Sequence, residues 1–200
     1  MTTSILSIRQ ACEQDMPGLS TICLKTADAG KDATALYSDP GYPGLRFALP
    51  YARFEPELAF VLEQDGTPVG YVLAARDTTD FEQHLQREWW PGLREKLAER
   101  AAILPLDAGI LDFIRQPVSK ELALIADYPA HLHINILPSA QGSGFGRRLI
   151  ETELAALRRA GVSGVHLGIN PKNDSVCAFY ERLGFRFLHR AQSIYMGQFL

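Results

Sequence analysis

Several features are scarce in this sequence of 200 residues, and each scarcity narrows the classes of protein to consider. Its three cysteines, Cys12, Cys23 and Cys177, are widely spaced and odd in number, which favours reduced thiols over a disulfide framework or a metal site. No apolar run reaches membrane-spanning length, and the amino terminus lacks the pattern of a secretion signal. These features predict a cytoplasmic protein without a membrane-spanning segment.

An excess of positive charge is also missing. The formal net charge is −3 at pH 7, with 20 Lys and Arg against 23 Asp and Glu, so no nucleic-acid or anionic-membrane surface is indicated. Internal repeats and low-complexity tracts are absent from the sequence. The length and the hydrophobic fraction of 46% predict one domain over residues 1–200 with a substantial core.

The most informative stretch covers residues 131–146, HLHINILPSAQGSGFG. Polar and apolar residues alternate at its start, which predicts a strand with His131, His133 and Asn135 on one side. A glycine-rich turn follows, and helical periodicity begins at Arg147. This stretch therefore predicts a strand, a turn and a helix in succession.

The glycines of the turn, Gly142, Gly144 and Gly146, are compatible with two roles. Glycine lets main-chain N–H groups approach an anion closely, and the unpaired amides and dipole of the following helix would attract a diphosphate. The same glycines would also serve a tight turn and close helix packing without any ligand. The turn alone leaves both interpretations open.

A second motif, about 30 residues downstream, favours the diphosphate. Residues 165–169 predict another strand, followed by NPKNDS at 170–175 and FYERLGF at 179–185. Together with the QGSGFG turn, this order resembles the GCN5-related N-acetyltransferase (GNAT) family. The first block is similar to that family's acetyl-CoA pyrophosphate loop, and the second to its Asn-x-x-Ser and Phe-Tyr-x-x-x-Gly-Phe helix.

The resemblance implies acetyl-CoA as co-substrate and a set of residues that would hold it. Main-chain groups of Ile134 and Ile136 would bond the pantetheine along a splayed strand, and Asn173 would contact the pantetheine arm or the adenosine side. Ser175 is also predicted to cap the following helix. The expected cofactor-binding residues are Ile134, Ile136, Leu137, Gln141, Gly142, Ser143, Gly144, Phe145, Gly146, Arg147, Asn173, Ser175 and Tyr180.

Acetyl transfer to an amine also needs an acid for the departing thiolate and a base for the amine. The resemblance places the Tyr180 hydroxyl near the thioester sulfur, and a phenol with a pKa of about 10 keeps its proton at neutral pH. A buried tyrosine bonded to a carbonyl is the alternative. Many relatives carry a glutamate on the cofactor strand, but this strand offers His131 and His133 instead. Asp127 and Asp77 are carboxylate alternatives, and each candidate base could have a purely structural role.

The amino-terminal half predicts the beginning of a sheet. Residues 4–9 predict a strand and residues 13–25 a helix, and apolar runs at 57–63 and 69–75 are joined by a hairpin signal. Residues 28–50 are rich in Gly, Pro, Asp and Tyr and predict a long irregular segment. Polar and aromatic residues in and beside this segment suit a substrate wall: Tyr37, Asp39, Tyr42, Arg46 and Tyr51.

An insert of about 50 residues, 77–130, separates the hairpin from the cofactor strand. Helices are predicted at 81–87, 93–104 and 119–125, with Trp89-Trp90-Pro91-Gly92 as a break after the first. The tryptophans would either stack on a ligand or anchor the insert to the core.

Short motifs around the insert narrow the resemblance. SDPG at 38–41, GYVL at 70–73 and DYPAH at 127–131 are similar to the carboxyl-terminal acetyltransferase-like domain of eukaryotic O-GlcNAcases and its free-standing bacterial relatives. The eukaryotic domain is usually regarded as a degenerate acetyltransferase. This chain keeps Gln141 and the glycines of the turn, so that kinship does not argue against cofactor binding here.

The sequence therefore predicts a mixed α/β domain with the GNAT-like acyl-CoA N-acyltransferase fold. Its twisted sheet would be mostly antiparallel and splayed at the cofactor strand, with helices on both faces. The predicted function is direct transfer from acetyl-CoA to an amine in a ternary complex, because no positioned Cys or Ser nucleophile is present. The acceptor could be a small amine, an amino sugar or a protein lysine, and the protein a monomer or a homodimer.

Two alternatives belong to other classes. One is a non-catalytic module that binds acetyl-CoA or another protein. The other is a dinucleotide-binding oxidoreductase, which would require a parallel sheet with its glycine-rich turn near the start of the chain.

Overall fold

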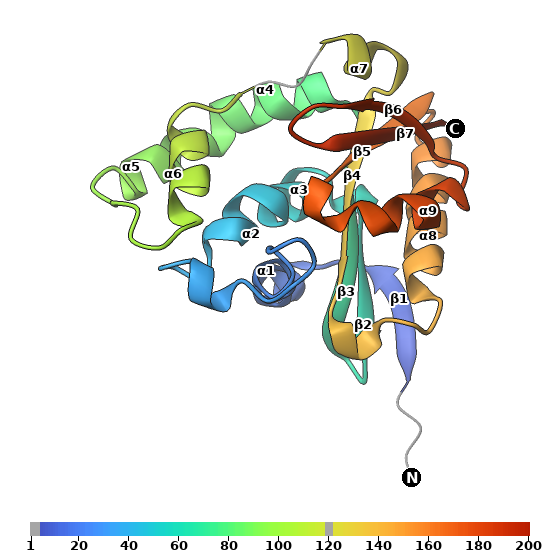
Figure 1. The fold of residues 1–200 in the computed structure, drawn as a ribbon, viewed down its shortest axis with the longest axis horizontal. Helices are drawn as coiled ribbons and strands as arrows, with labels where there is room; N and C mark the ends of the chain where they lie inside the picture. Colours follow the sequence, from blue (N-terminus) through green and yellow to red (C-terminus); the bar gives the residue numbers. More distant parts are fainter. Residues whose placement is uncertain (1–4, 119–121) are drawn as a thin grey trace.

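A computed structural model describes residues 5–118 and 122–200 of the chain (Figure 1). The strands are β1 (Leu6–Gln10), β2 (Ala59–Gln64), β3 (Thr67–Ala75), β4 (Ala130–Ile136), β5 (Gly164–Ile169), β6 (Arg186–Arg190) and β7 (Ile194–Phe199). The α-helices are α1 (Met16–Leu24), α2 (Tyr42–Phe47), α3 (Leu49–Phe54), α4 (Thr78–Glu88), α5 (Trp90–Lys96), α6 (Asp107–Arg115), α7 (Leu122–Asp127), α8 (Phe145–Arg159) and α9 (Cys177–Glu181). Short 3₁₀ helices are η1 (Glu13–Asp15), η2 (Thr34–Leu36), η3 (Pro56–Leu58), η4 (Pro138–Ala140) and η5 (Pro171–Val176).

The seven strands form one sheet in the order β1-β2-β3-β4-β5-β7-β6. Every neighbouring pair is antiparallel except β4 and β5. These two strands pair only at Ala130 with Val165 and at His131 with His166, and then diverge. The predicted splayed, mostly antiparallel sheet is confirmed, and this topology differs from the parallel sheet that the oxidoreductase alternative requires.

The predicted hairpin is confirmed and has a simple local cause. Asp65 and Gly66 have φ values of 50° and 81° between the paired strands β2 and β3. A two-residue turn with both φ values positive matches the right-handed twist of the strands, and Asp-Gly is a preferred pair for it. The strand predicted at residues 4–9 is present as β1, and the chain ends in β7, which pairs with β5 and β6.

The prediction of a long irregular segment at 28–50 is wrong in its second half. The segment contains η2, α2 and the start of α3. Pro43 and Pro50 lie in the first turns of α2 and α3, where a proline needs no N–H partner and its fixed φ suits a helix. These prolines begin helices, whereas the sequence interpretation took them as interruptions.

The insert between β3 and β4 is helical, but its boundaries differ from those predicted. Helix α5 begins at Trp90 with Pro91 in its first turn and ends at Lys96, well before residue 104. Helix α6 was not predicted. Residues 119–121 of the helix predicted at 119–125 lie outside the described residues, and the remainder begins α7.

The tryptophans fasten this insert to the rest of the domain, as one of the two interpretations predicted. The Trp89 Nε1–H donates to the carbonyl of Leu45 over 2.9 Å. Trp90 is 3% exposed, and its ring meets that of Phe113 edge-on at 5.6 Å. One tryptophan thus bonds α2, and the other packs against α6.

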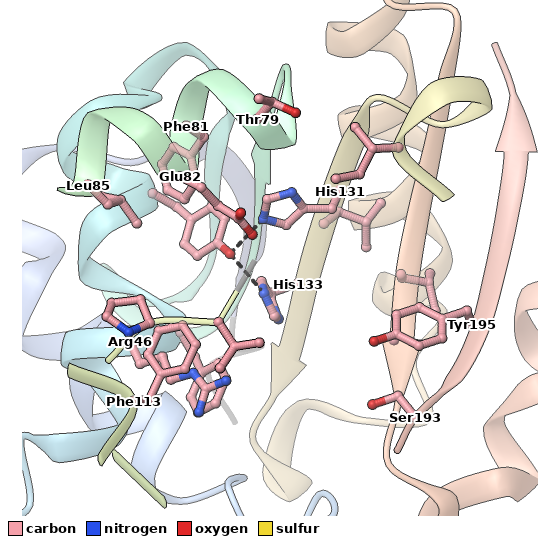
Figure 2. Close-up of a pocket in the computed structure, with 18 of the residues that line it drawn as sticks. Arg46, Thr79, Phe81, Glu82, Leu85, Phe113, His131, His133, Ser193 and Tyr195 are labelled. Atoms are coloured by element: carbon pink, nitrogen blue, oxygen red, sulfur yellow. Dashed lines mark hydrogen bonds between the residues drawn. The ribbon is translucent and has the colours of Figure 1, made fainter. Parts of the chain in front are cut away.

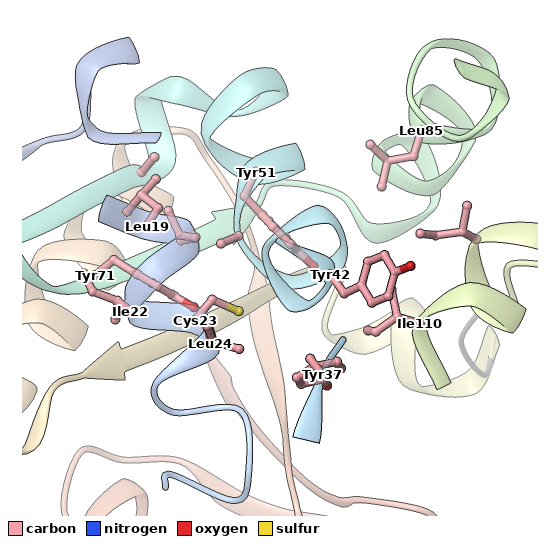
Figure 3. Packing of buried hydrophobic residues seen from close by; sticks show 14 of the residues in the cluster. Leu19, Ile22, Cys23, Leu24, Tyr37, Tyr42, Tyr51, Tyr71, Leu85 and Ile110 are labelled. Carbon is pink, nitrogen blue, oxygen red and sulfur yellow. The ribbon is translucent and has the colours of Figure 1, made fainter. Parts of the chain in front are cut away.

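Alternation along β3 creates two cores, one on each face of the sheet. Tyr71, Leu73 and Ala75 belong to a core with α1 to α6, whereas Val72 and Ala74 belong to a core with α8 and α9. Figure 1 shows the insert and α8 on opposite sides of the sheet. Figure 3 shows part of the first core, where Leu19 and Ile22 of α1 lie near Tyr71 of β3. Each such large apolar side chain contributes about 1.5–3 kcal/mol when it is buried.

Candidate functional site

Strand β4 pairs with β3 along one edge, and its other edge is open beyond the short pairing with β5. The N–H of Leu137 donates to Val69 in β3 over 2.8 Å, and antiparallel pairing alternates, so the main-chain groups of residues 135, 133 and 131 also face β3. The main-chain groups of Ile134 and Ile136 therefore face the opposite way, into the gap that opens where β4 and β5 diverge. Both are the residues predicted to bond the pantetheine.

The glycine-rich turn stands at the end of this open edge. Gly142 and Gly144 have φ values of 78° and 80°, which side-chain-bearing residues rarely adopt, and Gly144 is the N-cap of the 15-residue helix α8. Within the described part of the chain, the N–H groups of residues 142–147 have no hydrogen-bond partner. These six N–H groups are available as donors to an anion, and the dipole of α8 would add to the attraction.

Space around the turn fits a bound diphosphate. A Cβ added at Gly142 or Gly144 would meet no atom of the described chain within 4 Å, so the space beside their amides is open. A Cβ at Gly146 would lie 3.6 Å from both Ile136 and Phe179. A side chain at Gly146 would therefore make ordinary contacts with β4 and α9, whereas the positive φ values of Gly142 and Gly144 serve the turn itself.

Other predicted cofactor residues have local partners. The Gln141 Nε2 group donates to the carbonyl of Ile136 over 2.8 Å, and Ser143 Oγ donates to the carbonyl of Ala140 over 3.1 Å, so both side chains brace the turn. Phe145 is half-buried below Arg148, and the exposed Arg147 is paired with Glu151 at 2.7 Å.

Leu137 departs from the prediction in one respect. Its N–H donates to Val69, and its carbonyl accepts from Ala140 over 2.9 Å. Both main-chain groups are already engaged, so only its side chain is left to contact a cofactor.

Tyr180 lies on α9, is 9% exposed and packs edge-on against Phe179 and Phe185. No hydrogen bond joins its hydroxyl to any residue that the structure describes. The alternative of a tyrosine bonded to a carbonyl is therefore wrong among the described residues. Burial raises the pKa of Tyr180, so the hydroxyl stays protonated and able to donate at neutral pH.

The segment before α9 corrects one local prediction. Ser175 is exposed and lies inside η5, so it does not cap a helix. The cap is Asn170, whose side chain accepts from the N–H of Lys172 over 3.0 Å. Residues 171–176 form η5, in which only Asn173 has non-helical angles (φ −119°, ψ 35°), and the N-cap position of α9 is occupied by Val176, not Ser175. Asn173 is half-buried, and its Nδ2 is 3.7 Å from a Cβ built at Gly30.

The other side of β4 faces a cavity of about 730 Å³. His131 and His133 project into it from β4, Arg46 and Tyr51 from α2 and α3, and Ser193 and Tyr195 from the β6–β7 region (Figure 2). Of the predicted substrate-wall residues, Arg46 and Tyr51 line the cavity. Tyr37 and Tyr42 are buried in the first core instead, and Asp39 accepts the N–H of Gly41 in a turn.

A hydrogen-bonded chain joins the two histidines. Tyr51 Oη lies 2.8 Å from His131 Nε2 and 3.0 Å from His133 Nε2 (Figure 2). Thr78 Oγ1 lies 2.7 Å from His131 Nδ1. Thr78 Oγ1 also donates to the carbonyl of Pro129 over 2.7 Å. His131 and Tyr51 are nearly inaccessible to solvent, at 3% and 5% exposed.

The carbonyl of Pro129 fixes the direction of this chain, because a carbonyl only accepts. Thr78 therefore accepts from His131 Nδ1–H, and the Nε2 of a neutral His131 accepts from Tyr51. Tyr51 in turn accepts from His133 Nε2–H. A proton taken up at His133 can thus move along the chain toward His131.

Tyr51 connects the two histidines, and we call the chain His133–Tyr51–His131 the relay. Burial of Tyr51, opposed by Arg46 and reinforced by the charge of Glu82, raises its pKa, so the hydroxyl keeps its proton while it bridges the rings. The ring of Tyr51 meets His131 and His133 edge-on at 5.4 and 5.1 Å.

The carboxylate candidates are placed elsewhere. Asp127 ends α7, is exposed and does not line the cavity. Asp77 is the N-cap of α4 and accepts the N–H of Asp80 over 3.0 Å. The structure therefore brings together His131 and His133, but not Asp127 or Asp77.

Sequence reasoning missed Glu82, Ser193 and Tyr195, which line the cavity, and Thr78, which is buried and lies within hydrogen-bond distance of His131. Thr78 follows an N-cap and Glu82 sits on an amphipathic helix, positions where polar residues are common. No local signal distinguished them. Among the described residues, no helix is long and apolar enough to cross a bilayer, and no cluster of three metal-binding side chains occurs.

Comparisons with known proteins agree with this geometry. The chain is 39% identical to SsHAT, whose crystal structure superposes with a TM-score of 0.88 over 97% of this chain and 98% of that one. The structure of yncA from Salmonella typhimurium with its cofactor acetyl-CoA has a TM-score of 0.57 at 16% identity, over 98% of this chain and 94% of that one, and so shares the fold.

Curated relatives point the same way. Over 92% of this chain, the sequence is 22% identical to Protein O-GlcNAcase of Rattus norvegicus. The match spans only 20% of the length of that protein. Mycothiol acetyltransferase of Geodermatophilus obscurus is 44% identical over 52 residues, 26% of this chain and 17% of that protein. The model of the acetyltransferase (GNAT) family matches residues 27–185. The resemblance predicted from two short motifs is thus confirmed, and the chain belongs to the acetyltransferase (GNAT) family.

Proposed function

We propose that this protein transfers an acetyl group from acetyl-CoA directly to an amine bound in the cavity. The position of β4 between two half-sites carries this proposal. Its open edge and the adjoining turn offer main-chain groups on one side, and its His133 side chain reaches the cavity on the other. A single strand would thereby hold the two reactants together, which removes much of the entropic cost of their encounter.

The cofactor half would be made of main-chain groups. The N–H groups of residues 142–147 would bind the diphosphate, and the main-chain groups of Ile134 and the N–H of Ile136 would bind the pantetheine, since the Ile136 carbonyl already accepts from Gln141. Gln141 would keep the turn against the end of β4 through its bond to Ile136. Acetyl-CoA supplies an acyl group activated as a thioester when it is bound.

Proton transfers would be divided between the two halves. His133 would accept the proton that the amine loses as its C–N bond forms, and Tyr51 would pass a proton on to His131. Tyr180 would donate the proton that the sulfur gains as the C–S bond breaks. Because an amine nucleophile and these groups suffice, the proposal contains no covalent intermediate on the protein.

Steady-state kinetics test this proposal with acetyl-CoA and a panel of amines that includes small amines, an amino sugar and a lysine peptide. We expect amine-dependent release of thiol with intersecting initial-rate patterns, as a ternary complex requires. Parallel patterns would contradict direct transfer. Binding of acetyl-CoA without turnover for any amine would instead support the non-catalytic alternative.

The role of Tyr180 has its own test. Tyr180→Phe should lower kcat about tenfold or more while the KM for acetyl-CoA changes little, because only the transferred proton is lost. Tyr128→Phe makes the same change at a half-buried tyrosine that stacks on Phe199 at 4.9 Å, and should leave kcat near that of the wild type. Equal kcat in all three proteins would exclude Tyr180 as the acid.

A further inference from the structure

The cavity beside β4 has separate positive and negative ends. Among its described lining residues, Arg46 is the one Lys or Arg, and Glu82 is the one carboxylate. Figure 2 shows Glu82 beside His131, at the end with the two histidines, and Arg46 beside Phe113 at the other end. A ligand that carries both charges would match these two ends.

Arg46 is held rigidly between aromatic rings. Its guanidinium carbon lies 3.5 Å from the centre of the Phe113 ring and 4.7 Å from that of Phe47. Nη1 donates to the carbonyl of Gly109 over 3.3 Å. Stacked guanidinium groups keep their N–H donors in a fixed plane, which favours planar, bidentate partners.

This guanidinium has no carboxylate partner among the residues that the structure describes. Burial lowers the pKa of Arg46 to about 10, partly offset by the nearby tyrosines, so the group is still charged at neutral pH. A half-buried charge without a counter-ion is costly, and a bound anion would remove that cost.

The distance between the two ends sets the length of the ligand. The Phe47 ring lies 5.9 Å from the His133 ring, and the same ring packs against Arg46. One aromatic ring therefore separates the cation from the relay, and Phe81 and Trp90 add further apolar wall. A ligand that spans both ends needs several bonds between its two polar groups.

A single guanidinium also limits the kind of anion. One carboxylate is neutralised by one guanidinium, whereas a phosphate monoester carries about two charges at neutral pH and would need a second cation. The described lining offers no second Lys or Arg. A carboxylate is therefore the better match.

We propose that the acceptor is a small amine with a carboxylate several bonds away, bound with the carboxylate on Arg46 and the amine beside His133. This inference rests on the proposed acetyl transfer. It identifies a substrate class, small amino acids and compounds like them, and it makes Arg46 the residue that selects that class.

A matched series of amines tests the inference with the wild-type protein. Straight-chain amino acids from glycine to 6-aminohexanoate are each compared with the alkylamine that lacks the carboxylate. We expect one of the longer amino acids to exceed its alkylamine about tenfold or more in kcat/KM. Calorimetry of the same pairs, at saturating CoA, should show the same preference in binding and does not depend on turnover.

A variant assigns the preference to Arg46. Arg46→Met keeps an unbranched chain against the two rings and should reduce the ratio between amino acid and alkylamine to near one. Arg53→Met, at an exposed arginine of α3 that does not line the cavity, should leave the ratio unchanged.

The outcomes separate this inference from the proposed function. Equal or better use of the alkylamines, or a doubly blocked lysine peptide as the best acceptor, would overturn the substrate class while acetyl transfer still stands. If acetyl-CoA binds and no amine is turned over, acetyl transfer fails. Calorimetry then still decides whether the carboxylate is recognised. Equal heats for the amino acid and the alkylamine of each pair would overturn the proposed recognition by Arg46.

Discussion

The two sides of β4 use different chemical groups, main-chain groups on one side and side chains on the other. On the cofactor side, the candidate site consists of main-chain groups of Ile134, Ile136 and residues 142–147, which are close together in the sequence. On the acceptor side, the cavity is lined by side chains from α2, α3, α4, α6, β4 and the β6–β7 region. A site made of backbone is encoded locally, whereas a site made of side chains is encoded by the whole fold. The two sides should therefore respond differently to single substitutions.

The largest effect is expected where the backbone itself is changed. Gly144→Ala places a Cβ in the open space beside the turn amides, at a φ of 80° that alanine adopts with strain. We expect the affinity for acetyl-CoA to fall about a hundredfold, because the amides lose both their conformation and their access to the diphosphate. Isothermal titration calorimetry measures this directly.

Gly161 offers a matched control at the other end of α8. Its φ is 74°, and a Cβ there would also meet no described atom within 4 Å. Gly161→Ala should therefore destabilise the protein about as much, by about 1 kcal/mol. Its affinity for acetyl-CoA should match the wild type. If both variants lose affinity equally, the turn has no special role.

A smaller, purely kinetic effect is expected from the side-chain half. Tyr51→Phe removes the hydroxyl that bridges His131 and His133, and should lower kcat about ten- to a hundredfold without changing the affinity for acetyl-CoA. Tyr42→Phe makes the same change in the same core, 1% exposed but outside the cavity lining, and should be nearly silent in kcat. Similar kcat values for these two variants would show that the histidines do not act as a relay.

Each side also contains a fully buried carboxyl group, Asp107 or Glu153, and the pKa values of the two are shifted in opposite directions. Asp107, in the acceptor half, is fully buried and accepts the N–H groups of Ser38, Ile103 and Leu104 at 2.8 to 2.9 Å. Burial alone would raise the pKa of Asp107, but the bonds from Leu104, Ser38 and Ile103 outweigh it and lower the pKa to about 2. This carboxylate stays charged and connects the residue-38 loop to α6.

Asp107→Asn should destabilise the protein by about 2–3 kcal/mol at neutral pH, because an amide cannot accept all three bonds. A group with a lowered pKa stabilises the fold above its unfolded pKa of about 4 and loses this contribution as the pH falls toward about 2. The difference between wild type and variant should shrink over that window in urea unfolding curves. A constant difference would contradict the charged state.

Substitution of Glu153 on α8 should have the smallest effect on the free energy of unfolding, and it should stabilise the protein. It is fully buried, and neither carboxyl oxygen has a partner among the described residues. Burial, and then the nearby Glu55, raise the pKa of Glu153 well above its ordinary value. An acid with a raised pKa stabilises the fold fully below its unfolded pKa of about 4.3, and this contribution declines as the pH rises.

Glu153→Gln removes that dependence, because glutamine is neutral at every pH. Relative to the wild type, the variant should gain about 1 kcal/mol or more between pH 5 and pH 8, measured as the free energy of unfolding in urea. Glu99→Gln, at an exposed position, should show no such trend. A parallel pH dependence of all three proteins would mean that Glu153 is charged in the fold.

The same contrast explains what the sequence could predict. The hairpin at Asp65-Gly66 and the strand-turn-helix follow from local periodicity and turn chemistry. The family resemblance came from contiguous motifs, and the splayed sheet was implied by that resemblance. The cavity and its hydrogen-bonded chain could not be predicted in this way, because Tyr51, Thr78 and His133 come together only when segments tens of residues apart pack in the fold. Proline misled the interpretation at Pro43 and Pro50, since the same residue interrupts a helix or begins one, depending on its position.

A crystal structure with acetyl-CoA bound tests the central claim, that β4 brings the two half-sites together. We predict the diphosphate on the N–H groups of residues 142–147, the pantetheine along Ile134 and Ile136, and the acetyl group at the cavity, within reach of His133. An acetyl group on the far side of the sheet from His133, or a diphosphate bound away from the turn, would contradict the account.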